Sequence, residues 1–354
     1  NMGLKEFRFD EVTINFDKKR VPLSGAQREK RKGKYCYYGA QGVIDHIDDF
    51  IFDGTYLLIA EDGENLKSKK QNIAQIAEGQ FWVNNHAHIV QGNELCDTRY
   101  LCYLLNSMDL SGYVTGSAQP KLSQTNLNAV TLFLPPISIQ KKIVEYLHML
   151  DKKIAVNQQI NDNLYEMVNA YYASLFKDVE CEMTTIGNYA ERIYSGGTPT
   201  TSNATYWDGS FGWFSSGETR NRFVISTEKT ITQAGIDNSS TKLAAKHDIV
   251  MASAGQGFTR GQTSMLLLDT YVNQSVIVIH AERNILPYLF WNLANRYEEL
   301  RAISDSSSIR GSLTTKMIAS FEIPLANEES LQAFANFSWS VIPQIENNLL
   351  ENER

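Results

Sequence analysis

The 354-residue chain contains an internal repeat, and this feature limits its possible folds more than any other. The matched segments, in chain order, are Val83-Asn84-Asn85 with Val272-Asn273-Gln274, Tyr100-Leu101 with Tyr288-Leu289, and Leu134-Pro135 with Ile323-Pro324. The separation stays at 188–189 residues from the first pair to the last. A shared order and spacing indicate a duplicated unit, so we expect two similar globules instead of one continuous core.

Each copy reads as a mixed α/β (α+β) globule followed by a long helix. Short apolar runs at 55–59, 81–83, 248–251 and 275–279 are broken by Gly, Asn and Ser, which is typical of strands and turns. Each helix is expected after a proline, Pro136 in the first copy and Pro324 in the second. The predicted boundaries are a globule over 1–136, a spacer helix over 137–178, a second globule over 179–326 and an apparently short C-terminal helix over 327–354.

The central helix carries apolar or seam residues at alternating steps of four and three. These positions are Ile143, Leu147, Leu150, Ile154, Asn157, Asn161, Leu164, Val168, Tyr171 and Leu175. Such spacing is typical of a coiled-coil seam, and asparagines within a seam fix its register at some cost in stability. The C-terminal segment repeats the spacing with Ile342, Ile345 and Leu349, so we expect the two helices to pair antiparallel. A pseudo-two-fold axis would then relate the two globules.

The net charge of −7 is unevenly distributed along the chain. Residues 327–354 carry five acidic side chains and one basic one, whereas residues 18–34 carry eight basic side chains and one acidic one. Phosphate-contacting surfaces need a local basic excess and not a positive total, although a solvated loop is the alternative explanation of such a run. The total charge therefore does not exclude a nucleic-acid binder.

The chain lacks the usual sequence marks of catalysis. No phosphate-binding GxxxxGK[ST] loop, amino-methyltransferase tetrapeptide or G-x-S-x-G elbow occurs, and His86-Ala-His88 is explained better by a strand with one polar face than by a metal site. The four cysteines form no C-x-x-C pair, and no apolar run is long enough to span a membrane. We expect a non-enzymatic cytoplasmic protein with no bound cofactor and no membrane partner.

Several polar loops contain side chains that can pair with DNA base edges or phosphates. The candidate DNA-binding residues are Lys30, Arg31, Lys32, Lys34, Tyr38, Gln41, Lys67, Lys69, Lys70, Asn85, Lys121, Ser216, Glu218, Thr219, Arg220, Arg222, Gln256, Thr259, Arg260, Gln274 and Arg310. Ordinary turn-forming loops are the alternative for any one of them. As a set on a repeated frame, they suggest that two separate half-sites are read.

The segment 134–160, which begins Leu-Pro-Pro-Ile-Ser-Ile-Gln-Lys-Lys-Ile, resembles the central region of type I restriction–modification specificity subunits. Residues 37–43, 58–63 and 117–123 are also similar to recurring stretches of that family. The resemblance implies two target-recognition domains, each reading one half of a split DNA sequence. It also implies that the helices set the gap between the halves and dock methyltransferase subunits, two of them in the usual arrangement.

The resemblance further implies bacterial or archaeal origin and partners that carry the chemistry. Modification subunits would bring S-adenosylmethionine, and an ATP-dependent restriction subunit with Mg would act as translocase and endonuclease. Three alternatives stay open from the residues. One is the specificity component of a related system that cuts on both sides of a split site. Another is a DNA methyltransferase or nuclease whose motifs are not recognised. The third is a two-lobed scaffold with no affinity for DNA.

Overall fold

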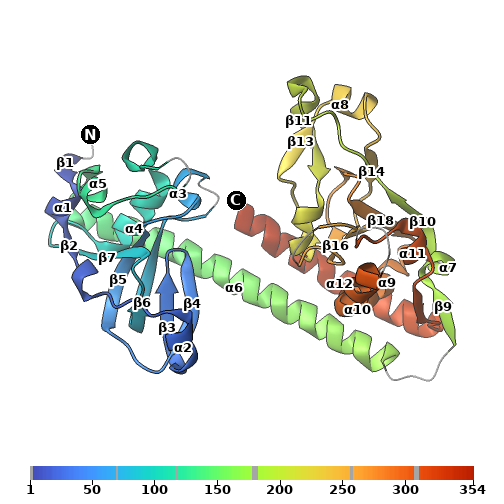
Figure 1. Ribbon diagram of the computed structural model, residues 1–354. Coiled ribbons are helices and arrows are strands. Elements are labelled where there is room, and N and C mark those ends of the chain that lie inside the picture. The colour runs from blue at the N-terminus through green and yellow to red at the C-terminus, as the bar shows by residue number, and fades with distance from the viewer. Residues whose placement is uncertain (1–2, 69–70, 117–118, 178–181, 256–257, 307–310) are drawn as a thin grey trace. The chain divides into compact units, whose positions relative to one another are not determined.

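The computed structural model describes residues 3–68, 71–116, 119–177, 182–255, 258–306 and 311–354 (Figure 1). Its internal contacts divide the chain into unit 1, Asn1–Lys152, and unit 2, Lys153–Arg354. The long helix α6 (Ile137–Phe176) contributes its first part to unit 1 and its second part to unit 2. Among the described residues no helix is long and apolar enough to cross a membrane.

Unit 1 is built around a six-stranded sheet with the order β2-β7-β5-β6-β3-β4. Its strands are β1 (Lys5–Arg8), β2 (Thr13–Asn15), β3 (Lys32–Gly39), β4 (Gly42–Ile47), β5 (Phe52–Ala60), β6 (Ala74–Val83), β7 (Ala87–Gly92) and β8 (Thr131–Leu134). Its short helices are α1 (Phe9–Val12), α2 (Gly25–Glu29), α3 (Asn65–Ser68), α4 (Thr98–Ser107) and α5 (Gln124–Asn128). β1 and β8 form a separate antiparallel pair.

The core of unit 1 lies between this sheet and α4. Leu57 and Ile59 of β5 are fully buried and pack in one cluster with Leu101 and Leu105 of α4. α4 begins at Asp97, whose carboxylate caps the helix by accepting hydrogen bonds from the N–H groups of Arg99 and Tyr100. The sheet therefore gains a helix on one face at a defined position.

Gln140 attaches the beginning of α6 to unit 1. Its side chain is fully buried, accepts a hydrogen bond from Asp97 N–H at 2.9 Å, and donates to the carbonyls of Leu95 and Pro135 at 2.9 Å each. Because a buried amide without partners would be costly, these bonds hold the first turns of the helix against the domain.

Unit 2 repeats this plan with most of its strands divided between two sheets, β10-β18-β15-β16-β12 and β13-β11-β17-β14, while β9 and β19 form a separate antiparallel pair. Its strands are β9 (Met183–Thr185), β10 (Ala190–Ser195), β11 (Trp207–Phe214), β12 (Phe223–Val224), β13 (Lys229–Ile231), β14 (Lys242–Ala244), β15 (Ile249–Ala252), β16 (Thr263–Leu266), β17 (Thr270–Val272), β18 (Val276–Ala281) and β19 (Glu322–Pro324). Its further helices are α7 (Ile186–Tyr189), α8 (Gln233–Asp237), α9 (Leu286–Asn295), α10 (Tyr297–Ser306), α11 (Thr315–Ala319) and α12 (Glu328–Glu353).

The core of unit 2 is rich in aromatic side chains. Trp291 of α9 is fully buried and stacks on Tyr165 of α6, with ring centroids 5.7 Å apart. Phe334 of α12 meets the same indole edge-on at 5.8 Å. α9, α6 and α12 therefore share one aromatic cluster.

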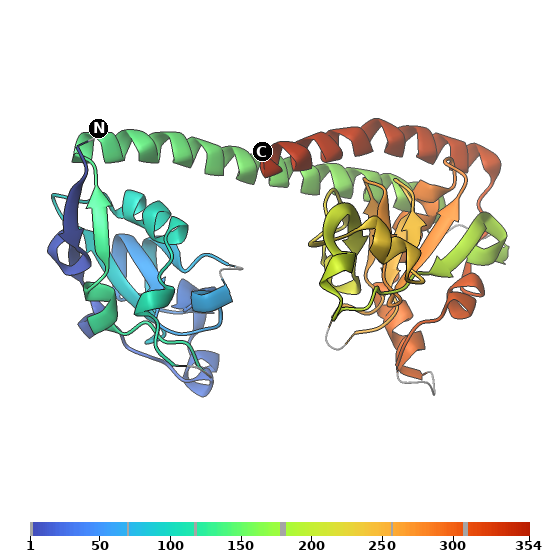
Figure 2. The same cartoon turned by 90° about the horizontal axis from the view of Figure 1, so that it is seen from above.

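α12 runs antiparallel to the second part of α6, as both ribbon views show (Figures 1 and 2). Asn157 donates hydrogen bonds to Glu351 Oε2 at 3.0 Å and to Asn352 Oδ1 at 2.9 Å. One turn further, Asn161 accepts a hydrogen bond from Asn348 at 2.8 Å. The residue number of the bonded α12 residue falls as that of the α6 residue rises, so the two helices are antiparallel.

The seam residues of α6 differ in their surroundings. Leu164 packs in one cluster with Ile342, Ile345 and Leu349 of α12, and Ile154 is half-buried. In unit 1, Ile143 and Leu147 are half-buried, and Leu150 is 56% exposed.

The mixed α/β class, the tandem repeat and the long helices predicted from the sequence are confirmed. α6 begins directly after Pro136, as expected. The second helix begins later than its proline suggests, because Pro324 closes β19 and Asn327 caps α12 by accepting a hydrogen bond from Ser330 N–H at 2.8 Å. A side-chain cap three residues further on thus sets the helix start.

Candidate nucleic-acid interface

Part of the basic run 18–34 is paired with carboxylates of unit 1. Arg28 and Lys32 contact Asp45 at 3.0 and 2.9 Å, and Arg31 contacts Asp48 at 2.9 Å. The hydrogen bond from Lys32 is the main cause that lowers the pKa of Asp45 to about 2. These three cations are therefore largely neutralised where they lie.

Arg31 is also held from its other side. Its guanidinium lies 4.9 Å from the centre of the Trp82 ring, within the range of a cation–π contact. The Trp82 N–H in turn donates to the Val21 carbonyl at 2.6 Å. The side chain thus braces the loop before β3.

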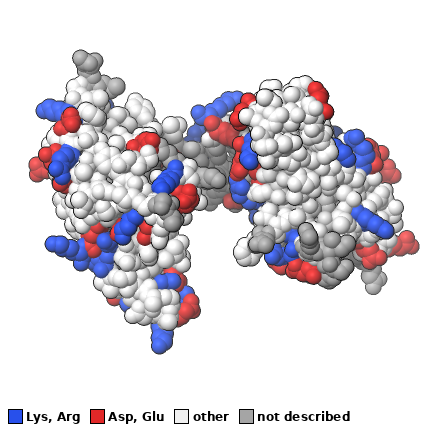
Figure 3. Space-filling model, turned by 45° about the horizontal axis from the view of Figure 1, so that its top comes forward, with Lys and Arg blue, Asp and Glu red and all other residues white. Residues whose placement is uncertain are grey.

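Lys30 and Lys34 are exposed, and neither has a carboxylate partner among the residues that the structure describes. The Lys34 ammonium lies 5.0 Å from the Tyr35 ring centre. On the face that Figure 3 views, Lys and Arg occur in small groups, often beside Asp or Glu. The two exposed cations without a described carboxylate partner thus lie at the end of α2 and on β3.

The other described candidates of unit 1 are distributed over strand β3, helix α3 and several turns and loops. Tyr38 packs edge-on against Phe81, and its burial raises the pKa of its hydroxyl. Gln41 and Asn85 are exposed in turns. The Lys67 ammonium donates to the Gly116 carbonyl at 2.8 Å, Lys121 pairs with Glu61 at 3.2 Å, and Lys69 and Lys70 lie outside the described residues.

In unit 2, the loop after β11 is held by the buried carboxylate of Glu218. One oxygen accepts from Ser215 N–H at 2.8 Å and from its hydroxyl at 3.0 Å, and the other accepts from Glu228 N–H at 2.9 Å. Thr219 is also buried and donates to the carbonyl of Ser216, which is half-buried. Glu218 and Thr219 therefore shape the loop from inside it.

The two arginines of the same loop are exposed. Arg220 forms an ion pair with Glu228. Arg222 lies 4.2 Å from the centre of the Tyr165 ring and 3.7 Å from Asp162. Such exposed pairs are weak and exchange readily with other anions.

Three further candidates, Thr259, Arg260 and Gln274, lie in two other loops of unit 2. Arg260 is 13% exposed, pairs with Asp305 and donates to the Gly311 carbonyl. Gln274 is exposed and accepts from Thr198, and Thr259 is half-buried. Gln256 and Arg310 lie outside the described residues.

A buried polar cluster around His88 was missed by the sequence reasoning. His88 Nδ1 lies 2.7 Å from Asp17 Oδ2, and Nε2 lies 2.8 Å from the Leu122 carbonyl. Burial alone would raise the pKa of Asp17, but the His88 hydrogen bond, the Ile89 N–H and the nearby charges together hold it below 3.8. The only sequence signal was the pair His86-Ala-His88.

That pair does not combine into a metal site. His86 contacts Asp62 at 2.8 Å, whereas His88 points to Asp17. No group of three His, Cys, Asp or Glu side chains suited to a metal ion occurs in the part of the chain that the structure describes.

Comparison with known proteins identifies the repeated unit. Residues 2–166 and 179–348 each match the model of the type I restriction modification DNA specificity domain. The fold is similar to that of a type I restriction–modification system S subunit from M. genitalium, with a TM-score of 0.64 and 13% identity over 100% of this chain and 93% of that one.

Two curated relatives are similar in sequence. A putative type I restriction enzyme specificity subunit of Haemophilus influenzae is 34% identical over 141 residues, and the EcoR124I/EcoR124II specificity subunit of Escherichia coli is 29% identical over 200 residues. The matches cover 40% and 54% of this chain, but only 36% and 48% of those relatives. Because the two consecutive domain matches span most of its length, the chain belongs to the family of type I restriction modification DNA specificity domains.

Proposed function

We propose that this chain is the DNA sequence-recognition subunit of a type I restriction–modification complex and has no catalytic activity of its own. The observation that carries the proposal is the double match to a DNA specificity domain, once in each copy of the repeat. Each globular domain reads one half of a bipartite target in double-stranded DNA. The separation of the halves is set by the paired helices.

Exposed side chains around the candidate loops are the best suited to contact DNA. Lys30 and Lys34 lack acidic partners among the described residues, and Arg220 and Arg222 form weak ion pairs at the surface. Cations of this kind can reach phosphates at little cost, because few existing interactions must be broken. Buried Glu218 and Thr219 act indirectly by holding their loop.

The partners follow from the same proposal. Modification subunits, two per complex, dock on the helices and supply S-adenosylmethionine chemistry, and a restriction subunit supplies ATP- and Mg-dependent translocation and cleavage. This chain binds none of these cofactors. The complex works in the cytoplasm of a bacterial or archaeal cell.

Selection of targets from random DNA by the reconstituted complex tests the proposal. The expected result is a bipartite motif with a fixed gap, whereas a continuous motif or no motif would overturn it. Cleavage on both sides of the selected site would instead indicate the related class of systems.

Calorimetry of the purified chain with S-adenosylmethionine tests the other class. No binding is expected at micromolar concentration. Tight binding would favour a methyltransferase with unrecognised motifs.

A further inference from the structure

One strand of unit 1 has an edge that is only partly paired. β6 pairs with β5 from Ala74 to Phe81, but it pairs with β3 only through Phe81, Trp82 and Val83. The N-terminal part of β6 therefore lacks a neighbouring strand on the β3 side among the described residues.

The hydrogen-bond register shows which backbone groups point to this open edge. Ala60 donates its N–H to the Ile73 carbonyl at 2.8 Å, which turns the N–H and C=O of Ala74 away from β5. By the two-residue period of a strand, the backbone groups of Ile76 and Glu78 point the same way. In the described parts of the chain, the backbone N–H and C=O groups of these two residues have no hydrogen-bond partner on the side away from β5.

The groups of Ala74 are satisfied by a side chain. Asn106 of α4 accepts from Ala74 N–H at 2.9 Å and donates to the Ala74 carbonyl at 2.9 Å. An amide side chain thus takes the place of a neighbouring strand at the first position. The next two outward-pointing positions are open.

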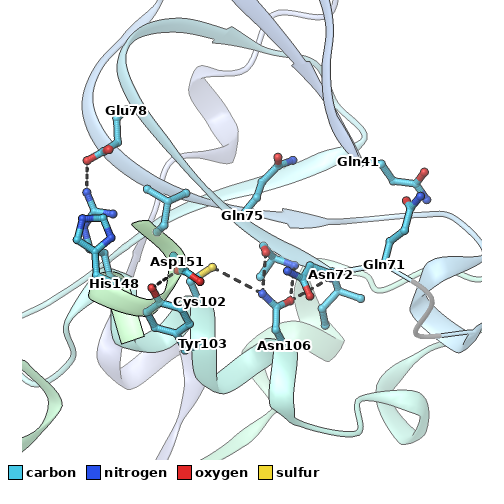
Figure 4. A pocket seen from close by; sticks show the side chains of 14 residues that line it. Gln41, Gln71, Asn72, Gln75, Glu78, Cys102, Tyr103, Asn106, His148 and Asp151 are labelled. Carbon is cyan, nitrogen blue, oxygen red and sulfur yellow. Dashed lines mark hydrogen bonds and ion pairs between the residues drawn. The ribbon is translucent and has the colours of Figure 1, made fainter. Parts of the chain in front are cut away.

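The open edge lines a groove of about 800 Å³ within unit 1 (Figure 4). Its opposite wall is the face of α4 that carries Arg99, Cys102 and Tyr103, together with His148 and Asp151 of α6. Tyr103 donates a hydrogen bond to Asp151, and Arg99 pairs with Glu78. A strand edge facing a helix across a groove is the geometry in which extended peptides add to a sheet.

Unit 2 fills the matching position with its own chain. Leu57 pairs with both Ile76 and Val90, and Ile249 pairs with both Met265 and Ile279, so Ile76 corresponds to Met265. There β12 lies parallel to β16, with Phe223 opposite Met265. The N–H of Met265 donates to the Arg222 carbonyl at 2.9 Å, and that of Leu267 donates to the Val224 carbonyl at 2.8 Å.

The helix opposite this strand edge also differs between the two units, in the size of the residues that face the edge. Phe223 packs against Phe290 and Trp291 of α9, at centroid distances of 5.5 and 6.4 Å. The repeat aligns these two residues with Cys102 and Tyr103 of α4, which are smaller and more polar. The first copy therefore has both the unpaired backbone and the space that the second copy uses for β12.

We propose that this groove binds an extended polypeptide segment of a partner protein, which adds to unit 1 as a strand parallel to β6 through Ile76 and Glu78. The segment carries an arginine or lysine followed by an apolar residue, as Arg222 precedes Phe223 of β12 in unit 2. The basic residue is complementary to Asp151, as Arg222 is to Asp162 beside β12 in unit 2. This interaction is separate from DNA reading and does not depend on it.

The test uses the full chain and a synthetic peptide with the sequence of residues 219–227, TRNRFVIST. Hydrogen exchange of the free chain should show fast exchange at the amides of Ile76 and Glu78 and protection at Met265 and Leu267. The peptide should protect the first pair of amides. Protection of Ile76 and Glu78 without peptide, or no binding at millimolar peptide, would overturn the proposal.

Two N-methylated peptides provide a matched control that leaves the protein unchanged. In a parallel strand seated like β12, the N–H at the Val224 position faces β6, whereas the N–H at the Phe223 position faces away. Methylation at the first position should weaken binding about tenfold, and methylation at the second should have little effect. Equal effects, or protection of the same amides by duplex DNA and not by peptide, would contradict a strand-binding groove.

Discussion

In unit 1, β6 faces a groove along Ile76 and Glu78, whereas in unit 2 the matching β16 is paired with β12. The helix across from the edge carries Tyr103 in one unit and Trp291 in the other. The three antiparallel strands behind the edge have the same pairing in both units. The two units thus share the same arrangement of three strands. The residues that face the outer strand determine whether its edge is paired with a further strand.

The largest expected difference between the two units is in the stability that the aligned aromatic residues Trp291 and Tyr103 provide. Trp291→Ala should cost about 3–5 kcal/mol of the free energy of unfolding, because it empties a fully buried site that touches Tyr165 and Phe334. Tyr103→Ala should cost about 1 kcal/mol, since its side chain borders the groove and is half-buried. Urea unfolding followed by circular dichroism measures both, and equal losses would mean that the two edges are packed alike.

The sequence predicted the frame because the frame depends on repeated patterns. The 188–189-residue offset, the apolar runs and the seam each have a period or spacing that reads directly from the chain. The open edge of β6 has no such signal, because its cause is that, among the described residues, unit 1 has no counterpart of β12. In the same way, Glu218 looks like a polar loop residue in the sequence, and only the fold shows that both its oxygens accept hydrogen bonds from backbone N–H groups, those of Ser215 and Glu228.

The seam of α6 gives the second comparison between the units. Ile345→Ala should cost about 3 kcal/mol, because this residue is 1% exposed and packs in the aromatic cluster of unit 2. Leu150→Ala should cost less than about 0.5 kcal/mol in the isolated chain, because Leu150 is 56% exposed. Thermal unfolding of the two variants separates these cases, and a large loss from Leu150→Ala would show that its part of the seam is covered.

The buried cluster of unit 1 should make its stability depend on acid pH. Because the folded-state pKa of Asp17 lies below its ordinary value of 3.8, its contribution is present above that value and is lost as the pH falls through the folded pKa. Asp17→Asn should cost about 2 kcal/mol at neutral pH, by weakening the bonds to His88 and Ile89.

The difference between the Asp17→Asn variant and the natural chain should shrink below about pH 4, where Asp17 itself becomes protonated. Hydrogen exchange at several pH values assigns the effect to each unit. A loss that is constant with pH, or one that appears in unit 2, would contradict this role.

The smallest expected effect concerns the exposed cations of the two units. Replacing Lys30 and Lys34 by Gln should lower the unfolding free energy by less than about 1 kcal/mol, because neither side chain has an acidic partner among the described residues and the contact of Lys34 with the Tyr35 ring is exposed. If both reach phosphates, the slope of log K against log salt should fall by about 2, with the selected sequence unchanged.

Arg220→Gln in unit 2 should reduce the slope by less than about 1, because its ion pair with Glu228 competes with phosphate. DNA binding by the reconstituted complex over a salt series measures both changes in slope, with Arg28→Gln, which removes a cation already paired with Asp45, as the control. A slope that changes as much for Arg28→Gln as for the lysine pair would mean that pairing within the folded chain does not decide which cations reach DNA.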